Sequence, residues 1–180
     1  MPDANLMNLE QLTQPILDFV RQNQGWAPLI VAAFAFGESL AVISVLIPAT
    51  VILLGIGALI GGAGLDFWPI WMGAIAGAVL GDWVSYELGR WFGPTIQHSW
   101  PLNRQPELMA RTEAMMRKYG AWGVFIGRFF GPLRALVPLV AGIFEMPRAS
   151  FQLANVASAL LWATSLLAPG AGLLEWLKAR

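Results

Sequence analysis

Two arginines, Arg128 and Arg134, lie six residues apart in a segment that is otherwise almost wholly apolar. A guanidinium group binds phosphate or carboxylate through a planar fork of N–H donors. Pro132 and Pro138 interrupt the same segment, and proline removes a backbone donor and disfavours a continuous helix. An ionisable side chain at membrane depth is unfavourable unless it faces protein or a wet cavity. The pattern therefore predicts a broken helical segment, with both prolines as breakers, that presents both arginines to an anionic group.

Two carboxylates and one hydroxyl lie in the other apolar stretches, namely Glu38, Asp82 and Thr50. Glu38 and Asp82 are candidates for proton coupling, because a buried carboxyl group can titrate in the physiological range. They are also candidates for structural counter-ions that neutralise the arginines, and the residues leave both interpretations open. Thr50 is a candidate hydrogen-bond donor to a phosphate group.

The composition is that of an integral membrane protein. Of the 180 residues, 57% are hydrophobic and 12% are charged, and the mean hydropathy is +0.59, which is too apolar for a soluble domain of this size. The net charge is zero, so nothing indicates a nucleic-acid partner. With no cysteine and one histidine, we expect neither a metal site nor a cofactor. The first 21 residues carry acids before any basic residue, so we do not expect a cleavable signal peptide there.

The first half of the chain divides into three segments. Residues 1–25 have apolar residues at helical spacing and predict an amphipathic interfacial helix. Residues 26–62 are too long for one crossing and too short for two, and Pro48 divides them. We interpret them as a first re-entrant hairpin with Glu38 on its long arm. Residues 66–92 predict a full-length span, whose Gly73-Gly77-Gly81 stripe permits close helix packing.

The second half repeats this order. Residues 93–120 form a polar loop with a surface helix, 121–145 form a second re-entrant hairpin around the arginines, and 149–177 form the last span, with Pro169-Gly170 as a break. The predicted fold is an all-α integral membrane domain over 26–180, with two opposed re-entrant hairpins and transmembrane helices in an inverted-repeat arrangement. Such repeats occur in secondary transporters, whose sites lie at the repeat interface. In this arrangement both termini lie on one side of the membrane and the 93–120 loop lies on the other. The side with this loop carries more Lys and Arg, which favours a cytoplasmic location for the loop.

Two long motifs resemble a known family. The run from Gly127 to Arg134 (GRFFGPLR) and the run from Gly81 to Gly93 (GDWVSYELGRWFG) are similar to signatures of DedA-family membrane proteins, the SNARE-associated or VTT-domain group. Further matching positions are Pro138, Ala141, Gly142, Phe151, Asn155 and Trp162. The resemblance extends from about Glu38 to Trp162, which is most of the chain.

The resemblance implies a protein that translocates lipids across a bilayer, such as undecaprenyl phosphate or a phospholipid, with the proton gradient as an energy source. It implies that Glu38 is the acidic residue before the first hairpin turn and that Arg128 and Arg134 are the paired arginines of the second. One position departs from the family pattern. Members with an acidic pair have a second carboxylate shortly after the first hairpin's proline, where this chain has Thr50.

These observations predict a multi-pass lipid translocase of the bacterial plasma membrane. Its partners would be lipids with anionic or phosphate-bearing headgroups and protons, and a homo-oligomer is compatible with the sequence. The alternative is a proton-coupled transporter of a small ion or solute. An enzyme is not expected, because phosphate chemistry needs a nucleophile and base or a metal cluster. A non-catalytic assembly factor stays open.

Overall fold

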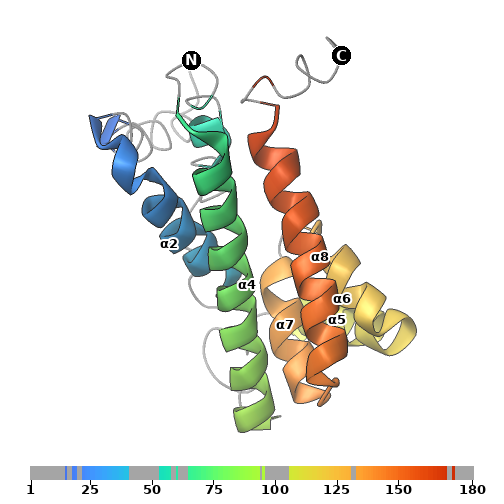
Figure 1. The fold of residues 1–180 in the computed structure, drawn as a ribbon. Helices are drawn as coiled ribbons and strands as arrows, with labels where there is room; N and C mark the ends of the chain where they lie inside the picture. Colours follow the sequence, from blue (N-terminus) through green and yellow to red (C-terminus); the bar gives the residue numbers. More distant parts are fainter. Residues whose placement is uncertain are drawn as a thin grey trace, which may run out of the picture.

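The computed structural model describes residues 15, 18–19, 22–40, 53–57, 60, 65–93, 95, 106–130, 133–169 and 172. The regular structure within these residues is entirely helical (Figure 1). Its elements are η1 (Gln24–Trp26), α2 (Ala27–Ser39), α4 (Phe67–Phe92), α5 (Pro106–Tyr119), α6 (Ala121–Gly127), α7 (Leu133–Ile143) and α8 (Arg148–Leu167).

Helix α4 is the element on which the others are assembled. Its first half packs along α2, in the same direction, where Gly73, Gly77 and Gly81 face Pro28, Ala32 and Phe36 in turn. A Cβ atom on any of these glycines would collide with the α2 backbone, so the predicted close packing along this stripe is confirmed. Helix α8 runs antiparallel beside α4 (Figure 1).

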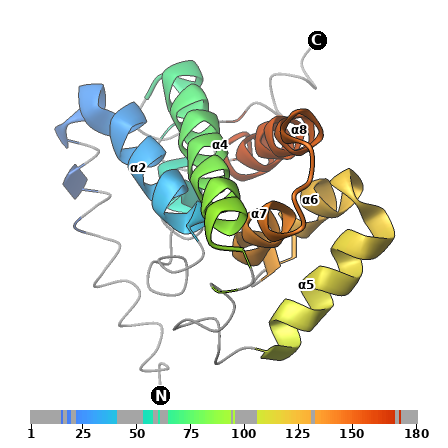
Figure 2. The same ribbon diagram turned by 90° about the horizontal axis from the view of Figure 1, so that it is seen from below.

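The second half of α4 packs against α7 in the opposite direction. Gly89 of α4 faces the backbone at Leu139, and Gly142 of α7 faces the backbone at Tyr86. Helix α5 lies outside α6 and α7 when the molecule is viewed from below (Figure 2). Met109 and Met116 of α5 are buried against this lower core, which gives the surface helix an apolar face.

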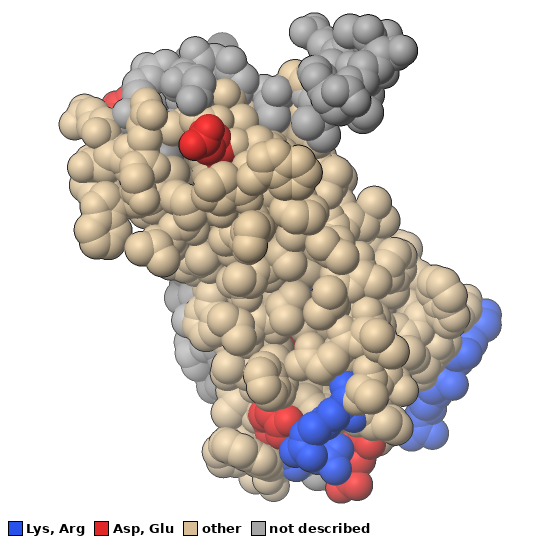
Figure 3. All heavy atoms as spheres, viewed as in Figure 1, with Lys and Arg blue, Asp and Glu red and all other residues tan. Residues whose placement is uncertain are grey.

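Among the described residues, two helices are long and apolar enough to cross a membrane, α4 with 26 residues and α8 with 20. At 1.5 Å per residue they measure about 39 and 30 Å, which matches a hydrocarbon core of about 30 Å. Trp68 and Trp91, near the two ends of α4, are 66% and 75% exposed, as expected for residues at the two membrane interfaces. On the face shown in Figure 3, a broad uncharged band separates charged side chains at the two ends.

Helices α6 and α7 are too short to cross a bilayer. They have 7 and 11 residues, or about 10 and 16 Å, and they pack against each other. Their length suits a segment that enters and leaves from one side. The re-entrant placement of this pair, and of the 26–62 segment, stays a prediction.

Two features of the helices differ from expectation. Pro138 is not a breaker, because α7 continues through it from Leu133 to Ile143; a proline inside a membrane helix is tolerated where packed neighbours support the freed backbone. Helix α2 ends at Ser39, well before Pro48. The backbone of the next residue, Leu40, is extended. Helix α8 ends at Leu167, just before the Pro169-Gly170 break that the sequence predicts within the last span. Pro48, Thr50 and Pro132 lie outside the described residues.

Candidate functional site

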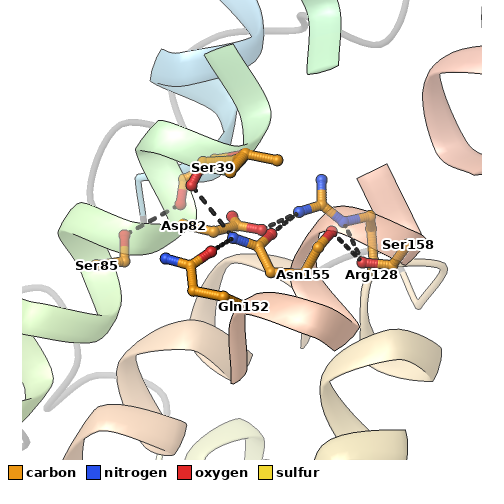
Figure 4. A network of polar contacts seen from close by, with 8 residues as sticks. Ser39, Asp82, Ser85, Arg128, Gln152, Asn155 and Ser158 are labelled. Carbon is orange, nitrogen blue, oxygen red and sulfur yellow. Dashed lines mark hydrogen bonds and ion pairs between the residues drawn. The ribbon is translucent and has the colours of Figure 1, made fainter. Parts of the chain in front are cut away.

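Arg128 is buried at the middle of the molecule and uses three partners. It directly follows α6, and its Nη2 donates to the carboxylate of Asp82 in an ion pair (Figure 4). Nη2 also donates to Oδ1 of Asn155 at 2.7 Å, and Nε donates to Oγ of Ser158 at 3.0 Å. The side chains of Arg128 and Asp82 are 5% and 7% exposed. The guanidinium is therefore held by three groups from two helices, α4 and α8.

Arg134 forms a second buried ion pair. It lies in the first turn of α7, and its Nη1 is 2.9 Å from Oε1 of Glu38, near the end of α2. The two side chains are 13% and 8% exposed. Nη2 of Arg134 is buried and makes no hydrogen bond in the part of the chain that the structure describes. The N–H groups of Nη2 are therefore unused among the described residues.

Trp162 of α8 lies beside both guanidiniums. The Cζ atom of Arg134 is 5.0 Å from the centre of the indole ring, and that of Arg128 is 5.9 Å away. Both distances are within the range of cation–π attraction. The buried indole therefore stabilises two like charges in one place without accepting a hydrogen bond from either.

A set of neutral polar groups supports the carboxylates and Asn155. The Ser39 side chain hydrogen-bonds to Asp82, and the Ser39 carbonyl accepts from Oγ of Ser85 at 3.1 Å. Nδ2 of Asn155 donates to the Val79 carbonyl at 3.2 Å. These bonds fix the end of α2 and the face of α8 against the middle of α4 (Figure 4).

The four charged groups come together because three helix ends meet at one level of α4. Helix α2 ends beside Asp82, α6 ends just before Arg128 and α7 begins just before Arg134. Asp82 is ten residues from the last residue of α4, Phe92, or about 15 Å along the helix. The cluster holds two guanidiniums and two carboxylates, so its formal charge is zero when all four are ionised.

The structure thus brings together four of the predicted site residues: Glu38, Asp82, Arg128 and Arg134. Thr50, the predicted phosphate donor, lies outside the described residues. Ser158 and Trp162 complete the site without an expected role. Their signal in the sequence is spacing: Asn155, Ser158 and Trp162 recur at three and four residues and so share one face of α8.

A second polar strip ties α4 to the turn between α7 and α8. The hydroxyl of Tyr86 donates to the Met146 carbonyl at 2.5 Å and accepts from Nη1 of Arg90 at 3.2 Å. The Tyr86 ring stacks on Phe151 with ring centres 4.3 Å apart. These contacts join the second half of α4 to the turn after α7 and to α8, and they are separate from the bonds of the four charged groups.

The fold and the site define an all-helical membrane protein with a buried, internally neutralised charge cluster. The VTT domain family model matches residues 47–172, and the chain belongs to this family, the DedA group. It is 38% identical over 153 residues to the inner membrane protein YabI of Escherichia coli K12, covering 84% of this chain and 60% of YabI. It is 34% identical over 135 residues to the inner membrane protein YghB of the same organism, covering 74% and 56%.

An uncharacterized membrane protein of Buchnera aphidicola is 30% identical over 155 residues, covering 86% of this chain and 60% of that protein. The chain thus spans about 60% of the length of these curated relatives. No solved structure matches the chain. The relatives' names place the family in membranes, which agrees with the apolar surface of α4 and α8.

Proposed function

We propose that this protein is a lipid translocase of the bacterial inner membrane that carries a phosphate-bearing headgroup between leaflets. The observation that supports this proposal is the burial of Arg128 and Arg134, each beside a carboxylate, far from either end of α4. A guanidinium pair at that depth has an anionic ligand as its natural partner. Undecaprenyl phosphate and anionic or zwitterionic phospholipids all carry such a group.

The mechanism is an exchange of anions on the guanidiniums. In the resting state Glu38 and Asp82 neutralise the arginines. A phosphate that enters the cluster adds negative charge in a low-dielectric site, where like charges repel strongly. Uptake of a proton by Glu38 or Asp82 restores neutrality and frees the guanidinium for phosphate. Proton movement would then accompany headgroup movement.

The acyl chains would stay in the bilayer while the headgroup passes. Phe129 and Phe130 directly follow Arg128 and are exposed on the turn after α6. An exposed aromatic pair beside a buried cation suits a lipid whose head is bound by protein and whose tails remain in hydrocarbon. In this mechanism α6 and α7 form the re-entrant hairpin that opens the cluster laterally.

The test is a reconstituted transport assay. Purified protein in liposomes is given labelled undecaprenyl phosphate or labelled phospholipids, with and without a pH gradient. Arg128→Lys keeps the charge but loses the planar fork that reaches Asp82, Asn155 and Ser158, so we expect transport to be lost. Arg111→Lys, at an exposed position of α5, is the matched control and should transport normally. Full transport by Arg128→Lys would contradict the guanidinium mechanism.

The second candidate is a proton-coupled transporter of a small anion. The same ion pairs favour it, because any small anion could replace a carboxylate on Arg134. The two candidates differ in the assay: solute uptake without lipid movement supports the transporter, and movement of labelled lipid by pure protein supports the translocase.

A further inference from the structure

The two arginines differ in how fully their donors are used. Arg128 donates through Nη2 and Nε to Asp82, Asn155 and Ser158. Arg134 pairs through Nη1 with Glu38, and its buried Nη2 has no hydrogen-bond partner in the described part of the chain. The great majority of buried hydrogen-bond donors in proteins have a partner, so an unpaired one marks a position where a further acceptor fits.

The surroundings of Arg134 keep this donor available. The guanidinium lies over the ring of Trp162, with Cζ 5.0 Å from the ring centre, and the indole N–H is a donor that cannot accept a hydrogen bond from Nη2. The attraction is directed through the ring face, so it holds the cation without occupying Nη2. Arg134 is also the less buried of the two arginines, at 13% against 5% for the side chain.

We propose that Arg134 receives the phosphate oxygen first, through Nη2, and that Arg128 is a fixed anchor of the cluster. This assignment rests on the proposed function and divides it between the two arginines. When Glu38 leaves Nη1, the Nη1 and Nη2 donors of Arg134 form a fork that binds two phosphate oxygens. Asp82, Asn155 and Ser158 meanwhile keep Arg128 in place, so its charge attracts the headgroup without leaving its partners.

The experiment compares one substitution at both positions in the full chain. Wild type, Arg134→Lys and Arg128→Lys are prepared in phosphatidylcholine nanodiscs. Binding of hexyl phosphate and of inorganic phosphate is measured by calorimetry against empty nanodiscs, and thermal unfolding is measured without ligand. The first probe has a headgroup with a short tail and the second is a free anion, so their comparison separates a lipid headgroup from free phosphate.

Lys at 134 can keep the single contact with Glu38 but cannot supply the second donor. We therefore expect Arg134→Lys to bind hexyl phosphate about tenfold more weakly or worse, which corresponds to one good hydrogen bond to a charged group, with little change in unfolding temperature. Lys at 128 cannot reach three partners, so Arg128→Lys should unfold at least about 6 °C lower. Failure of Arg128→Lys to fold, with Arg134→Lys folded, supports the same assignment.

Equal losses of stability at the two positions would overturn the division of roles, and so would failure of Arg134→Lys to fold. Unchanged binding by Arg134→Lys would also overturn it. If wild type binds neither probe, the proposed function fails, and the unfolding temperatures still decide whether Arg128 alone is the anchor. Tighter binding of inorganic phosphate than of hexyl phosphate would assign the same donor to a free anion and contradict the lipid headgroup.

Discussion

Arg128 and Asp82, 46 residues apart in the chain, form a buried ion pair that joins the turn after α6 to the middle of α4. Glu38 and Arg134 form the second pair at the same level, between the end of α2 and the start of α7. Each pair therefore connects one half of the chain to the other. A change in the Arg128–Asp82 pair should mainly alter the stability of the fold, and a change in the Arg134–Glu38 pair should mainly alter the handling of an anionic headgroup.

Replacing Asp82 should destabilise the protein strongly. Asp82→Asn keeps the shape of the side chain but leaves Arg128 as a buried charge without its counter-ion, which costs about 3–5 kcal/mol for a buried pair. The measurement is thermal unfolding in nanodiscs. Glu87→Gln is the control, because it breaks the pair with Arg148, whose side chain is 59% exposed, and exposed pairs contribute little.

The double variant Asp82→Asn/Arg128→Gln tests whether Asp82 and Arg128 stabilise the protein as a pair. Removing both charges leaves no unpaired ion, so it should recover part of the stability that Asp82→Asn loses. A double variant that is less stable by the full sum of the two single changes would mean that Asp82 and Arg128 do not act as a pair.

The contribution of Trp162 to ligand binding should depend on the aromatic face of its side chain. Trp162→Leu removes the cation–π contact with both arginines, and we expect an affinity for hexyl phosphate lower by about 1–2 kcal/mol, with Trp162→Phe between Leu and wild type. Trp71→Leu is the matched control. Trp71 donates to Thr164 at 3.0 Å, away from the arginines, so this change should lower stability and leave affinity unchanged.

If Trp162→Phe and Trp162→Leu had equal affinities for hexyl phosphate, the indole would act only by filling space. Loss of affinity in Trp71→Leu as large as in the Trp162 variants would show that general loosening of the α4–α8 packing is the cause.

Glu38 should connect transport to the pH gradient. Glu38→Gln keeps a hydrogen-bonding side chain near Arg134 but cannot exchange a proton. We expect lipid movement by this variant in liposomes to be insensitive to an imposed pH gradient to which wild type responds. Glu107→Gln on the exposed face of α5 is the control. A Glu38→Gln variant that keeps the full gradient response would assign proton coupling elsewhere, with Asp82 as the next candidate.

The α2–α4 contact should not accept a methyl group. Gly77→Ala would place a Cβ atom against the Ala32 carbonyl oxygen, and overpacking of this kind costs about 1–3 kcal/mol. Thermal unfolding measures the loss. Gly25→Ala is the control, because a Cβ atom there has no neighbour within 4 Å in the described part of the chain. If the Gly77→Ala variant proved as stable as wild type, the two helices would have to separate without loss.

Much of the fold could be predicted from local pattern. The length and apolar composition of residues 66–92 indicated a span, and the glycines at every fourth position indicated where another helix approaches. The charged residues inside apolar segments had to be buried and paired, because an unpaired ion there is unfavourable whatever the fold. Local rules failed at Pro138, since packing of α7 against α4 supports a helix that the proline alone would interrupt.

The sequence by itself determined that this is a helical membrane protein with two arginines and two carboxylates inside its apolar segments. Only the tertiary structure decided which carboxylate meets which arginine, that Trp162 lies beside both guanidiniums, and that Arg128 has three partners while Nη2 of Arg134 has none among the described residues. The physical reason is that these contacts depend on where three helices end along α4. How helices far apart in the chain lie along one another is decided by tertiary packing, which no local sequence pattern encodes.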